Sequence, residues 1–290
     1  MYRSMTSNRA GLEFYDPGFE NPGRSLLGLL FRLRPSDREK LLFGISPTCL
    51  PLQKVLRWCL GGSFVIESHF TDGPLANYAF ECWSSEKYFM LGSKFENEVQ
   101  ALLSEMVSPG DVGYDVGSHI GYMAMLFSSL VGARGKVFSF EPSPYNFARL
   151  ARNIELNPQA KRHVKVTRAA VSDCEGVGWL HEDSSQSMIQ AGGAAEGASR
   201  VETVRLDDFV FRDGHAAPDF LKIDVEGHAG PCLRGMTRIL KTFRPAMIME
   251  IHHESEAEEV RVHLEAGGYT FRTIDTEDQF PRRIVAEPRS

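Results

Sequence analysis

Apolar and polar residues alternate in short blocks from about residue 95 onward, and the blocks switch between strand and helix periods. Val112, Tyr114 and Val116 recur at the period of a strand, and residues 120–130 continue at helical spacing. The same switch recurs further along and predicts a parallel sheet with helices on both faces. The predicted strands are 112–116, 136–140, 164–171, 219–225, 246–251, 268–274 and 283–286, and the predicted helices are 96–105, 120–130, 144–156, one from near 230, and 254–266.

The first 94 residues lack this rhythm and predict a separate extension or cap, which leaves 95–290 as the main domain. Turns at Asp16 and Asn21, each followed by Pro-Gly, predict a loose arm over residues 1–24. The apolar segment 25–34 ends in basic residues, which suits a helix packed on its own domain, on a partner subunit in a homodimer, or on a membrane surface.

Two further segments are unusual in composition. Residues 64–70 predict a strand, and the aromatic side chains of 78–89 suit either a lid or acceptor wall, or a small hydrophobic subcore. Residues 184–200 are rich in Gly, Ala and Ser and predict a flexible loop that closes over the acceptor.

Composition narrows the class of protein. The chain has 290 residues and 42% hydrophobic content, enough for one large α/β domain plus an extension. Its net charge of -6 gives no basic footprint and argues against a nucleic-acid partner. The five cysteines contain no Cys-x-x-Cys pair, so we expect reduced, mostly buried thiols. The first 30 residues lack a secretory pattern and no apolar run approaches the ~20 residues that span a bilayer, so we expect a cytoplasmic protein without stable membrane insertion.

Candidate chemistry begins where the first main-domain strand becomes a helix. The pattern there is Asp115-x-Gly117-x-x-x-Gly121 rather than Gly-x-Gly-x-x-Gly, and a carboxylate in the turn would repel a pyrophosphate. This argues against a nicotinamide-dependent dehydrogenase and favours a cationic ligand such as S-adenosylmethionine. Glu141 ends the next strand about 20 residues on, where a ribose-hydroxyl acceptor is expected. The alternative is that Asp115 caps the helix and Glu141 is a solvated strand-end charge.

Three ordered motifs carry a family resemblance: Gly113-Tyr-Asp-Val-Gly-Ser-His-Ile-Gly-Tyr, Phe140-Glu-Pro-Ser-Pro and Leu221-Lys-Ile-Asp-Val-Glu-Gly. Together they resemble the FkbM family of S-adenosylmethionine-dependent methyltransferases, over roughly residues 95–275. The resemblance implies a doubly wound, Rossmann-like class I methyltransferase sheet of seven strands, the last antiparallel. The family usually has a second glutamate where this chain has Ala229, and His228 is the obvious replacement.

The cofactor site follows from these motifs. We expect Asp115 and the two glycines to hold the methionine end, Glu141 to accept from the ribose hydroxyls, and Asp173 to read the adenine. The full predicted set is Asp115, Gly117, His119, Ile120, Gly121, Glu141, Pro142, Ser143, Ser172, Asp173 and Asp224.

The predicted catalytic residues are His252, Asp224 and Glu226, at the ends of two strands. Strand ends carry the chemistry in open α/β sheets, and histidine is suited to accept a hydroxyl proton. His252 is the expected general base, and Asp224 or Glu226 orients it or the acceptor. Alternatively, these residues cap a helix or are solvated strand-end residues.

The predicted function is O-methylation of a hydroxyl on a small-molecule natural product or sugar. No metal is assigned; a metal-assisted version would use a divalent cation, with ligands from Asp224, Glu226, Glu250, His228 and His252, whose spacing is not diagnostic. A catalytically inactive scaffold is a further alternative, supported by Ala229.

Overall fold

The computed structural model describes residues 65–83, 86, 95–183, 186–190, 198–275 and 279–289. The chain divides into two compact units, Met1–Phe95 and Glu96–Ser290. The predicted arm, segment 25–34 and the aromatic residues Tyr88 and Phe89 lie outside the described residues. The role of the first 94 residues as an extension or cap stays a prediction.

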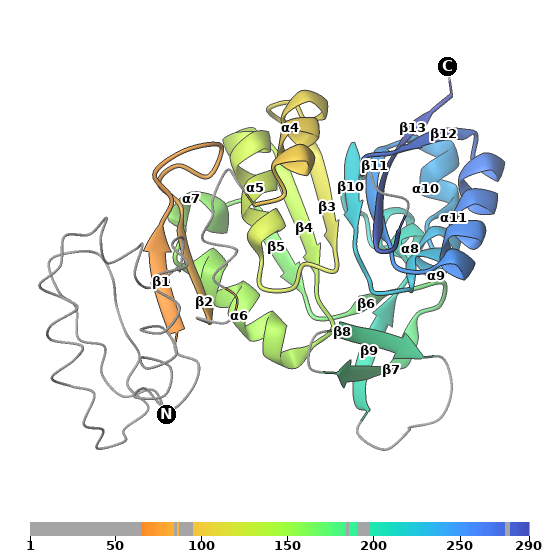
Figure 1. The fold of residues 1–290 in the computed structure, drawn as a ribbon, viewed down its shortest axis with the longest axis horizontal. Coiled ribbons are helices and arrows are strands. Elements are labelled where there is room, and N and C mark those ends of the chain that lie inside the picture. The colour runs from red at the N-terminus through yellow and green to blue at the C-terminus, as the bar shows by residue number, and fades with distance from the viewer. Residues whose placement is uncertain are drawn as a thin grey trace, which may run out of the picture. The chain divides into compact units, whose positions relative to one another are not determined.

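In the first unit, β1 (Val65–His69) and β2 (Ala79–Trp83) form an antiparallel pair (Figure 1). Tyr78 and Phe80 are buried there, and the Phe80 ring lies 6.0 Å from that of Phe70. Burial of these rings favours the subcore interpretation over a wall of exposed aromatic side chains.

The second unit is built on a seven-stranded sheet with the order β12-β13-β11-β10-β3-β4-β5. β13 pairs antiparallel with both of its neighbours, and the other pairs in the sheet are parallel. This is the doubly wound arrangement that the sequence predicts, with the last strand reversed. The strands are β3 (Val112–Val116), β4 (Lys136–Phe140), β5 (Val164–Thr167), β10 (Phe220–Ile223), β11 (Ala246–Ile251), β12 (Tyr269–Thr273) and β13 (Arg282–Pro288).

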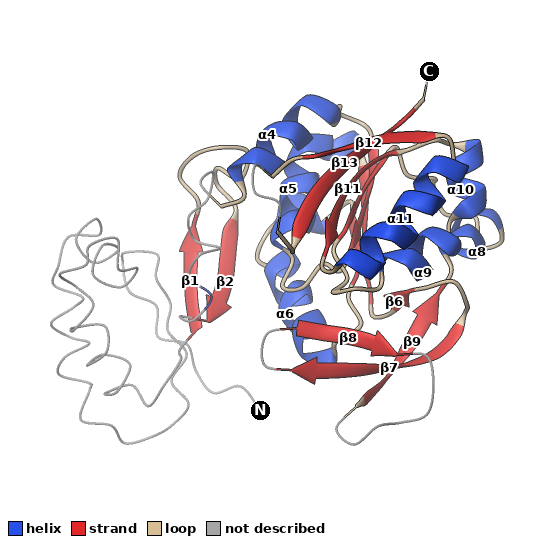
Figure 2. Cartoon of the chain, turned by 45° about the vertical axis from the view of Figure 1, so that its right-hand side comes forward, coloured by secondary structure: helices blue, strands red, loops and turns tan. Residues whose placement is uncertain are grey.

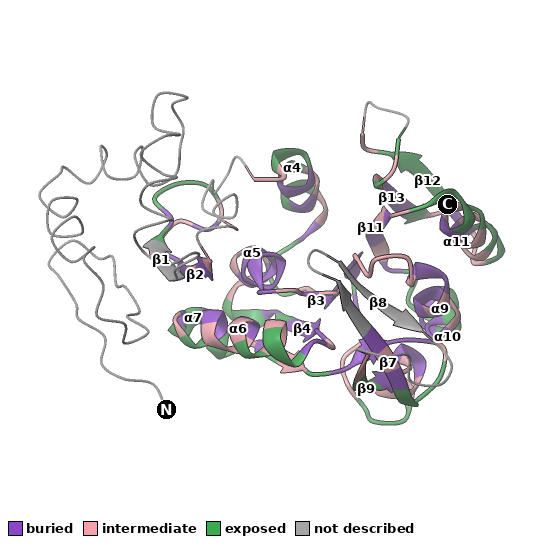
Figure 3. Cartoon of the chain, turned by 60° about the horizontal axis from the view of Figure 1, so that its bottom comes forward, coloured by how far each residue is buried: buried purple, intermediate pink, exposed green. Residues whose placement is uncertain are grey.

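Helices cover both faces of this sheet, with α4 to α6 on one side and α8 to α11 on the other (Figure 2). The central strands β3, β4, β10 and β11 are largely buried (Figure 3), because both faces pack against helices, whereas the edge strand β12 is mostly exposed. The helices are α4 (Asn97–Met106), α5 (Tyr122–Val131), α6 (Pro144–Glu155), α7 (Pro158–Lys161), α8 (Leu206–Phe211), α9 (Ala229–Arg234), α10 (Thr237–Thr242) and α11 (Glu254–Ala266), and a 3₁₀ turn, η3, spans Gly132–Arg134.

A second, four-stranded sheet lies between β5 and α8 in the chain, with the order β6-β9-β7-β8. Two predictions were wrong here. The strand expected at 164–171 breaks after Thr167, because Ala170 and Val171 pair with β9 in the second sheet instead. The loop expected at 184–200 contains β8, which pairs antiparallel with β7; residues 184–185 and 191–197 lie outside the described part. The strands are β6 (Ala170–Val171), β7 (Gly176–Asp183), β8 (Gln186–Gln190) and β9 (Ser199–Val204).

Among the described helices, none has the length and apolar character needed to cross a bilayer. Of the described cysteines, Cys82 and Cys232 are buried and Cys174 is exposed, while Cys49 and Cys59 fall outside the described residues.

Candidate active site at the carboxyl ends of β3, β4, β10 and β11

Asp115 lies within β3 and its side chain is fully buried. Neither carboxylate oxygen has a hydrogen-bond partner in the described part of the chain. Burial raises the pKa of Asp115 to about 6, against the opposing charge of Lys222 on the adjacent strand β10. A buried carboxylate without donors is costly, so this one is suited to a ligand that brings a positive charge or hydrogen-bond donors.

The loop after β3 depends on two glycines with positive φ, +84° at Gly117 and +94° at Gly121. A Cβ on Gly117 would lie 1.7 Å from the backbone oxygen of Asp224, and one on Gly121 would lie 2.6 Å from the Leu150 side chain. The glycines therefore permit close packing of the loop on its own protein neighbours. The sequence predicts close backbone approach at these positions, and the structure identifies the partners as Asp224, the residue after β10, and Leu150 in α6.

Glu141 connects the loop after β3 to the loop after β4. Its two oxygens accept hydrogen bonds from the backbone N–H groups of His119, at 2.8 Å, and Ser143, at 2.9 Å. Glu141 is buried, and burial raises its pKa to about 7, partly opposed by these hydrogen bonds. The interpretation of Glu141 as a solvated strand-end charge is therefore wrong.

Three neighbours from the predicted cofactor set have structural roles. The Ile120 side chain is buried, and its backbone oxygen accepts from Asn153 Nδ2 at 2.8 Å. Ser143 is the N-cap of α6 and accepts from the backbone N–H of Asn146, and Pro142 lies between it and Glu141. These contacts fix the shape of both loops.

The two side chains of the predicted adenine end, Ser172 and Asp173, each contact other side chains of the protein. Asp173 pairs with Arg234 at 2.8 Å, and Arg234 also pairs with Glu259. Ser172 Oγ lies 3.1 Å from His228 Nε2. His228 therefore contacts this network and is not part of the group formed by Asp224, Glu226 and His252. That it takes the role of the family's second glutamate stays a prediction.

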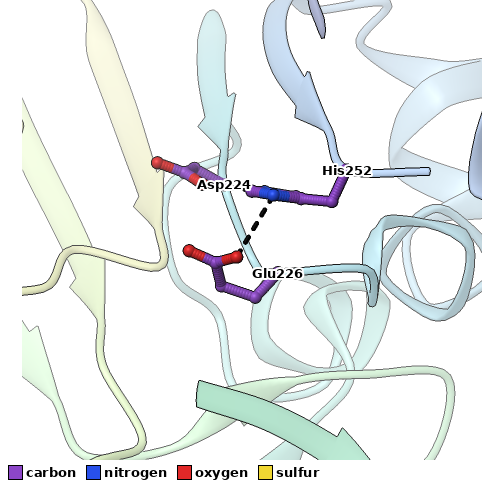
Figure 4. Close-up of side chains that lie close together, drawn as sticks. All are labelled: Asp224, Glu226 and His252. Carbon is purple, nitrogen blue, oxygen red and sulfur yellow. Dashed lines mark hydrogen bonds and ion pairs between the residues drawn. The ribbon is translucent and has the colours of Figure 1, made fainter. Parts of the chain in front are cut away.

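Asp224, Glu226 and His252 do come together, as predicted (Figure 4). His252 Nε2 lies 3.3 Å from Asp224 Oδ1, and His252 Nδ1 lies 3.1 Å from Glu226 Oε2. The imidazole is 7% exposed, whereas the two carboxylates are 25% and 27% exposed. The ring is thus enclosed between two partly exposed side chains, and the Glu226 Oε2 that faces it is itself buried.

This geometry favours the charged form of the imidazole. Burial alone would lower the pKa of His252, but the hydrogen bond to Asp224 and the charge of Glu226 outweigh burial and raise it. Because both ring nitrogens face carboxylates, an acceptor hydroxyl can reach one of them only by taking the place of a carboxylate oxygen.

Lys222 completes the electrostatics and was missed as a site residue. It is buried in β10, and its Nζ lies 2.8 Å from Asp224 Oδ2. Burial opposes its charge, but Asp224, followed by Glu96 and Asp115, raises the pKa of the lysine. The sequence could have identified it, because a lysine in the most apolar predicted strand is expected to be buried, and lysine is almost never fully buried unless it is paired with a carboxylate.

Acidic side chains outnumber basic ones at this edge of the sheet. Glu250, opposite Arg283 in register, has a pKa raised to about 7 by burial and by the charge of Asp224. The described carboxylates that share the field of Lys222 are Glu96, Asp115, Asp224, Glu226 and Glu250. These five carboxylates face Lys222, the charged form of His252 and Arg283, which also pairs with Asp275, so the site has surplus negative charge that suits a cationic ligand.

The same side chains also have the donor types of a divalent-cation site. Donor atoms of Asp224, Glu226 and His252 all lie within 4.8 Å of one another. Carboxylate oxygen and imidazole nitrogen are ligands for several divalent metals. Of the five ligands predicted from sequence, these three converge.

Comparison with known proteins places the chain in a family. Residues 115–271, more than half of the chain, match the model of the methyltransferase FkbM domain. Hexuronic acid methyltransferase AglP from Haloferax volcanii is 34% identical over 161 residues, 54% of this chain and 62% of that protein. The 31-O-demethyl-FK506 methyltransferase FkbM from Streptomyces tacrolimicus is 33% identical over 163 residues, 44% of this chain and 60% of that protein.

The matched region thus spans less than two thirds of either curated relative. A solved structure of methyltransferase FkbM from Methylobacillus flagellatus KT is 16% identical, with a TM-score of 0.47, and the match covers 70% of this chain and 54% of that one. The family model covers the β3 loop, Glu141 and the Asp224–His252 cluster, and on that match the chain belongs to the FkbM methyltransferase family.

Proposed function

We propose that this protein is an S-adenosylmethionine-dependent O-methyltransferase whose acceptor is a hydroxyl of a sugar or another small-molecule natural product. The observation that carries the proposal is the fully buried Asp115, whose oxygens lack partners in the described chain, one strand from a buried Glu141. One relative is named a hexuronic acid methyltransferase and the other a 31-O-demethyl-FK506 methyltransferase, and the second name gives an oxygen position.

The residues fit this cofactor. The orphaned Asp115 carboxylate and the surplus negative charge suit its ammonium and sulfonium groups, which a pyrophosphate-bearing dinucleotide does not carry. Glu141 has its carboxylate fixed by two backbone N–H groups, and we assign it to the ribose hydroxyls. When bound, the cofactor supplies an electrophilic methyl group. Ser172 and Asp173 would line the adenine end, with one Asp173 oxygen already held by Arg234.

The protein's own contribution is alignment and proton removal. Asp224 accepts from His252 Nε2 and fixes the ring, while Lys222 holds the other oxygen of Asp224. His252 Nδ1, which faces Glu226, then takes the proton of the acceptor hydroxyl as that hydroxyl enters. Glu226 orients the hydroxyl from the position that it holds beside Nδ1.

Calorimetric titration tests the proposal, with S-adenosylhomocysteine as the ligand and NAD as the negative control. We expect micromolar binding of S-adenosylhomocysteine, on the order of -8 kcal/mol, and no binding of NAD. Asp115→Ala and Glu141→Ala should each abolish measurable binding, whereas Glu155→Ala, a change in an exposed carboxylate of α6, should not. Absence of binding by the wild-type protein would favour an inactive scaffold.

Cofactor affinity should also depend on pH. The pKa of Asp115 is raised to about 6 and that of Glu141 to about 7, in each case first by burial. Both are proposed to bind the cofactor as charged carboxylates, so protonation below these pKa values removes their negative charges. The affinity for S-adenosylhomocysteine should therefore fall on the order of tenfold from pH 8 to pH 6. Titrations at several pH values measure this. A flat profile, or one that Glu141→Gln leaves unchanged, would contradict the assignment.

A metal-assisted version of the transfer is the second candidate, because three of its predicted ligands converge. A divalent cation at Asp224, Glu226 and His252 would polarise the acceptor hydroxyl and lower its pKa. It would compete with the hydrogen bond between His252 and Asp224 and with the ion pair between His252 and Glu226, so the two versions exclude each other. The methyl-transfer rate before and after chelation separates them.

A further inference from the structure

Glu256 lies in the first turn of α11, is almost fully buried, and makes two hydrogen bonds outside its own helix. Its Oε1 accepts from the backbone N–H of Ala229 at 3.0 Å. Its Oε2 accepts from the backbone N–H of His252 at 2.7 Å. One carboxylate therefore joins the first residue of α9 to the residue that follows β11.

These two attachment points carry the proposed catalytic side chains. Ala229 directly follows the turn of residues 224–228, which presents Asp224 and Glu226. His252 receives its carboxylate partners from that turn. By fixing both backbones, Glu256 sets the separation between the imidazole and its two carboxylates.

The turn needs such an external restraint. Glu226 has φ +47° and Gly227 has φ +91°, so two successive residues adopt the left-handed conformation, which is unfavourable for a glutamate. Gly227 also packs on His253, the residue that follows His252, since a Cβ on Gly227 would lie 2.4 Å from the His253 ring. The turn therefore contacts the residues that follow β11 while Glu226 has an unfavourable backbone conformation. We expect this conformation to relax unless another contact restrains the turn.

We propose that Glu256 is the positioning residue of this site: it holds the 224–228 turn against His252, so that both imidazole nitrogens stay within reach of Asp224 and Glu226. A carboxylate suits the position because two N–H donors converge on it and it offers only acceptors. Glutamine has nearly the same shape but turns an NH₂ toward one of those donors. Glu256→Gln therefore tests the need for two acceptor oxygens without changing how the side chain packs.

The inference rests on the proposed role of His252, but its test does not require methyl transfer. Imidazole N–H protons that are hydrogen-bonded to carboxylates exchange slowly and give downfield proton resonances, and His252→Gln identifies those of His252 by their loss. The spectra are recorded for the wild-type protein, Glu256→Gln, Glu256→Ala and the control Glu254→Gln. Glu254 is exposed in the same turn of α11.

We expect the His252 resonances to be lost in Glu256→Ala and in Glu256→Gln, and to be retained in Glu254→Gln. Resonances that persist in a folded Glu256→Gln protein would overturn the proposal, and so would their loss in Glu254→Gln. If Glu256→Ala does not fold, Glu256→Gln and Glu256→Asp decide: the aspartate keeps both acceptors and should retain at least one resonance. Wild-type protein that shows the resonances but does not bind S-adenosylhomocysteine would contradict the proposed function and leave this inference intact.

Discussion

Replacing Gly117 with alanine is expected to abolish cofactor binding and to lower the free energy of unfolding by more than about 5 kcal/mol, at the extreme of single substitutions. The new Cβ would lie 1.7 Å from the backbone oxygen of Asp224. That contact involves two backbone segments, so no side-chain rotation relieves it. Either β3 and β10 separate at their carboxyl ends, or the loop that precedes α5 moves away from Asp115 and Glu141.

A matched glycine separates this clash from backbone strain. Gly214 has φ +76°, close to the +84° of Gly117, but a Cβ there meets no atom within 4 Å. Gly214→Ala should cost only the strain of a left-handed alanine, about 1 kcal/mol, and should bind the cofactor normally. Urea denaturation and calorimetry of both variants give the comparison. Equal losses of stability would mean that conformation, and not the contact with Asp224, makes Gly117 necessary.

The glycine loop shows how far the sequence could be interpreted. The spacing of Asp115, Gly117 and Gly121 predicts a strand, a turn and a helix, and all three form, with the helix beginning at Tyr122 instead of Ile120. These predictions depend only on local sequence, because the hydrophobic period, the turn residues and the start of the helix are all set by consecutive residues. The sequence also predicts that Asp224, Glu226 and His252 meet, since the carboxyl ends of parallel strands share one edge of the sheet.

What the sequence could not supply are contacts that depend on side-chain direction across distant elements. His228 and Ala229 are adjacent in the chain, yet His228 turns to Ser172 while the Ala229 backbone binds Glu256 from α11. Glu256 is indistinguishable in sequence from the exposed glutamates around it on that helix. Only the tertiary packing of α9 on α11 reveals that its carboxylate is buried.

The second sheet was missed for a different reason. β7 contains glycine and acidic residues, which are depleted in strands, and β8 lies within the stretch 184–200 that is rich in Gly, Ala and Ser. Pairing with the neighbouring strands overrides that preference, since residues 176–180 of β7 pair with β9 and residues 179–183 pair with β8. Composition therefore predicts a loop where the structure has a hairpin.

His252→Ala is expected to lower the rate of methyl transfer on the order of 10²- to 10⁴-fold, the usual contribution of a general base, with little change in cofactor affinity. The rate is measured as release of S-adenosylhomocysteine, with a hydroxylated acceptor that the wild-type enzyme methylates. His263→Ala removes an imidazole from the far end of α11 and should leave the rate unchanged. Retained transfer in His252→Ala would eliminate the base assignment.

The pH dependence of the same rate gives an independent test, because the sign is fixed by the site. A general base must be neutral, and the carboxylates of Asp224 and Glu226 raise the pKa of His252 above its ordinary 6.5, although burial opposes them. The wild-type rate should therefore rise with pH, with its midpoint above about 6.5. Glu226→Gln removes one of the charges that raises this pKa, so its midpoint should move to lower pH while its maximal rate falls.

A metal at the same side chains predicts a different pattern. Cation binding favours neutral His252, so the midpoint would report competition between proton and metal and would shift when the metal concentration changes. Activity that is lost on chelation and restored by a divalent cation would assign Asp224, Glu226 and His252 as ligands. Full activity after exhaustive chelation, with a midpoint that moves only in Glu226→Gln, would assign the proton to His252.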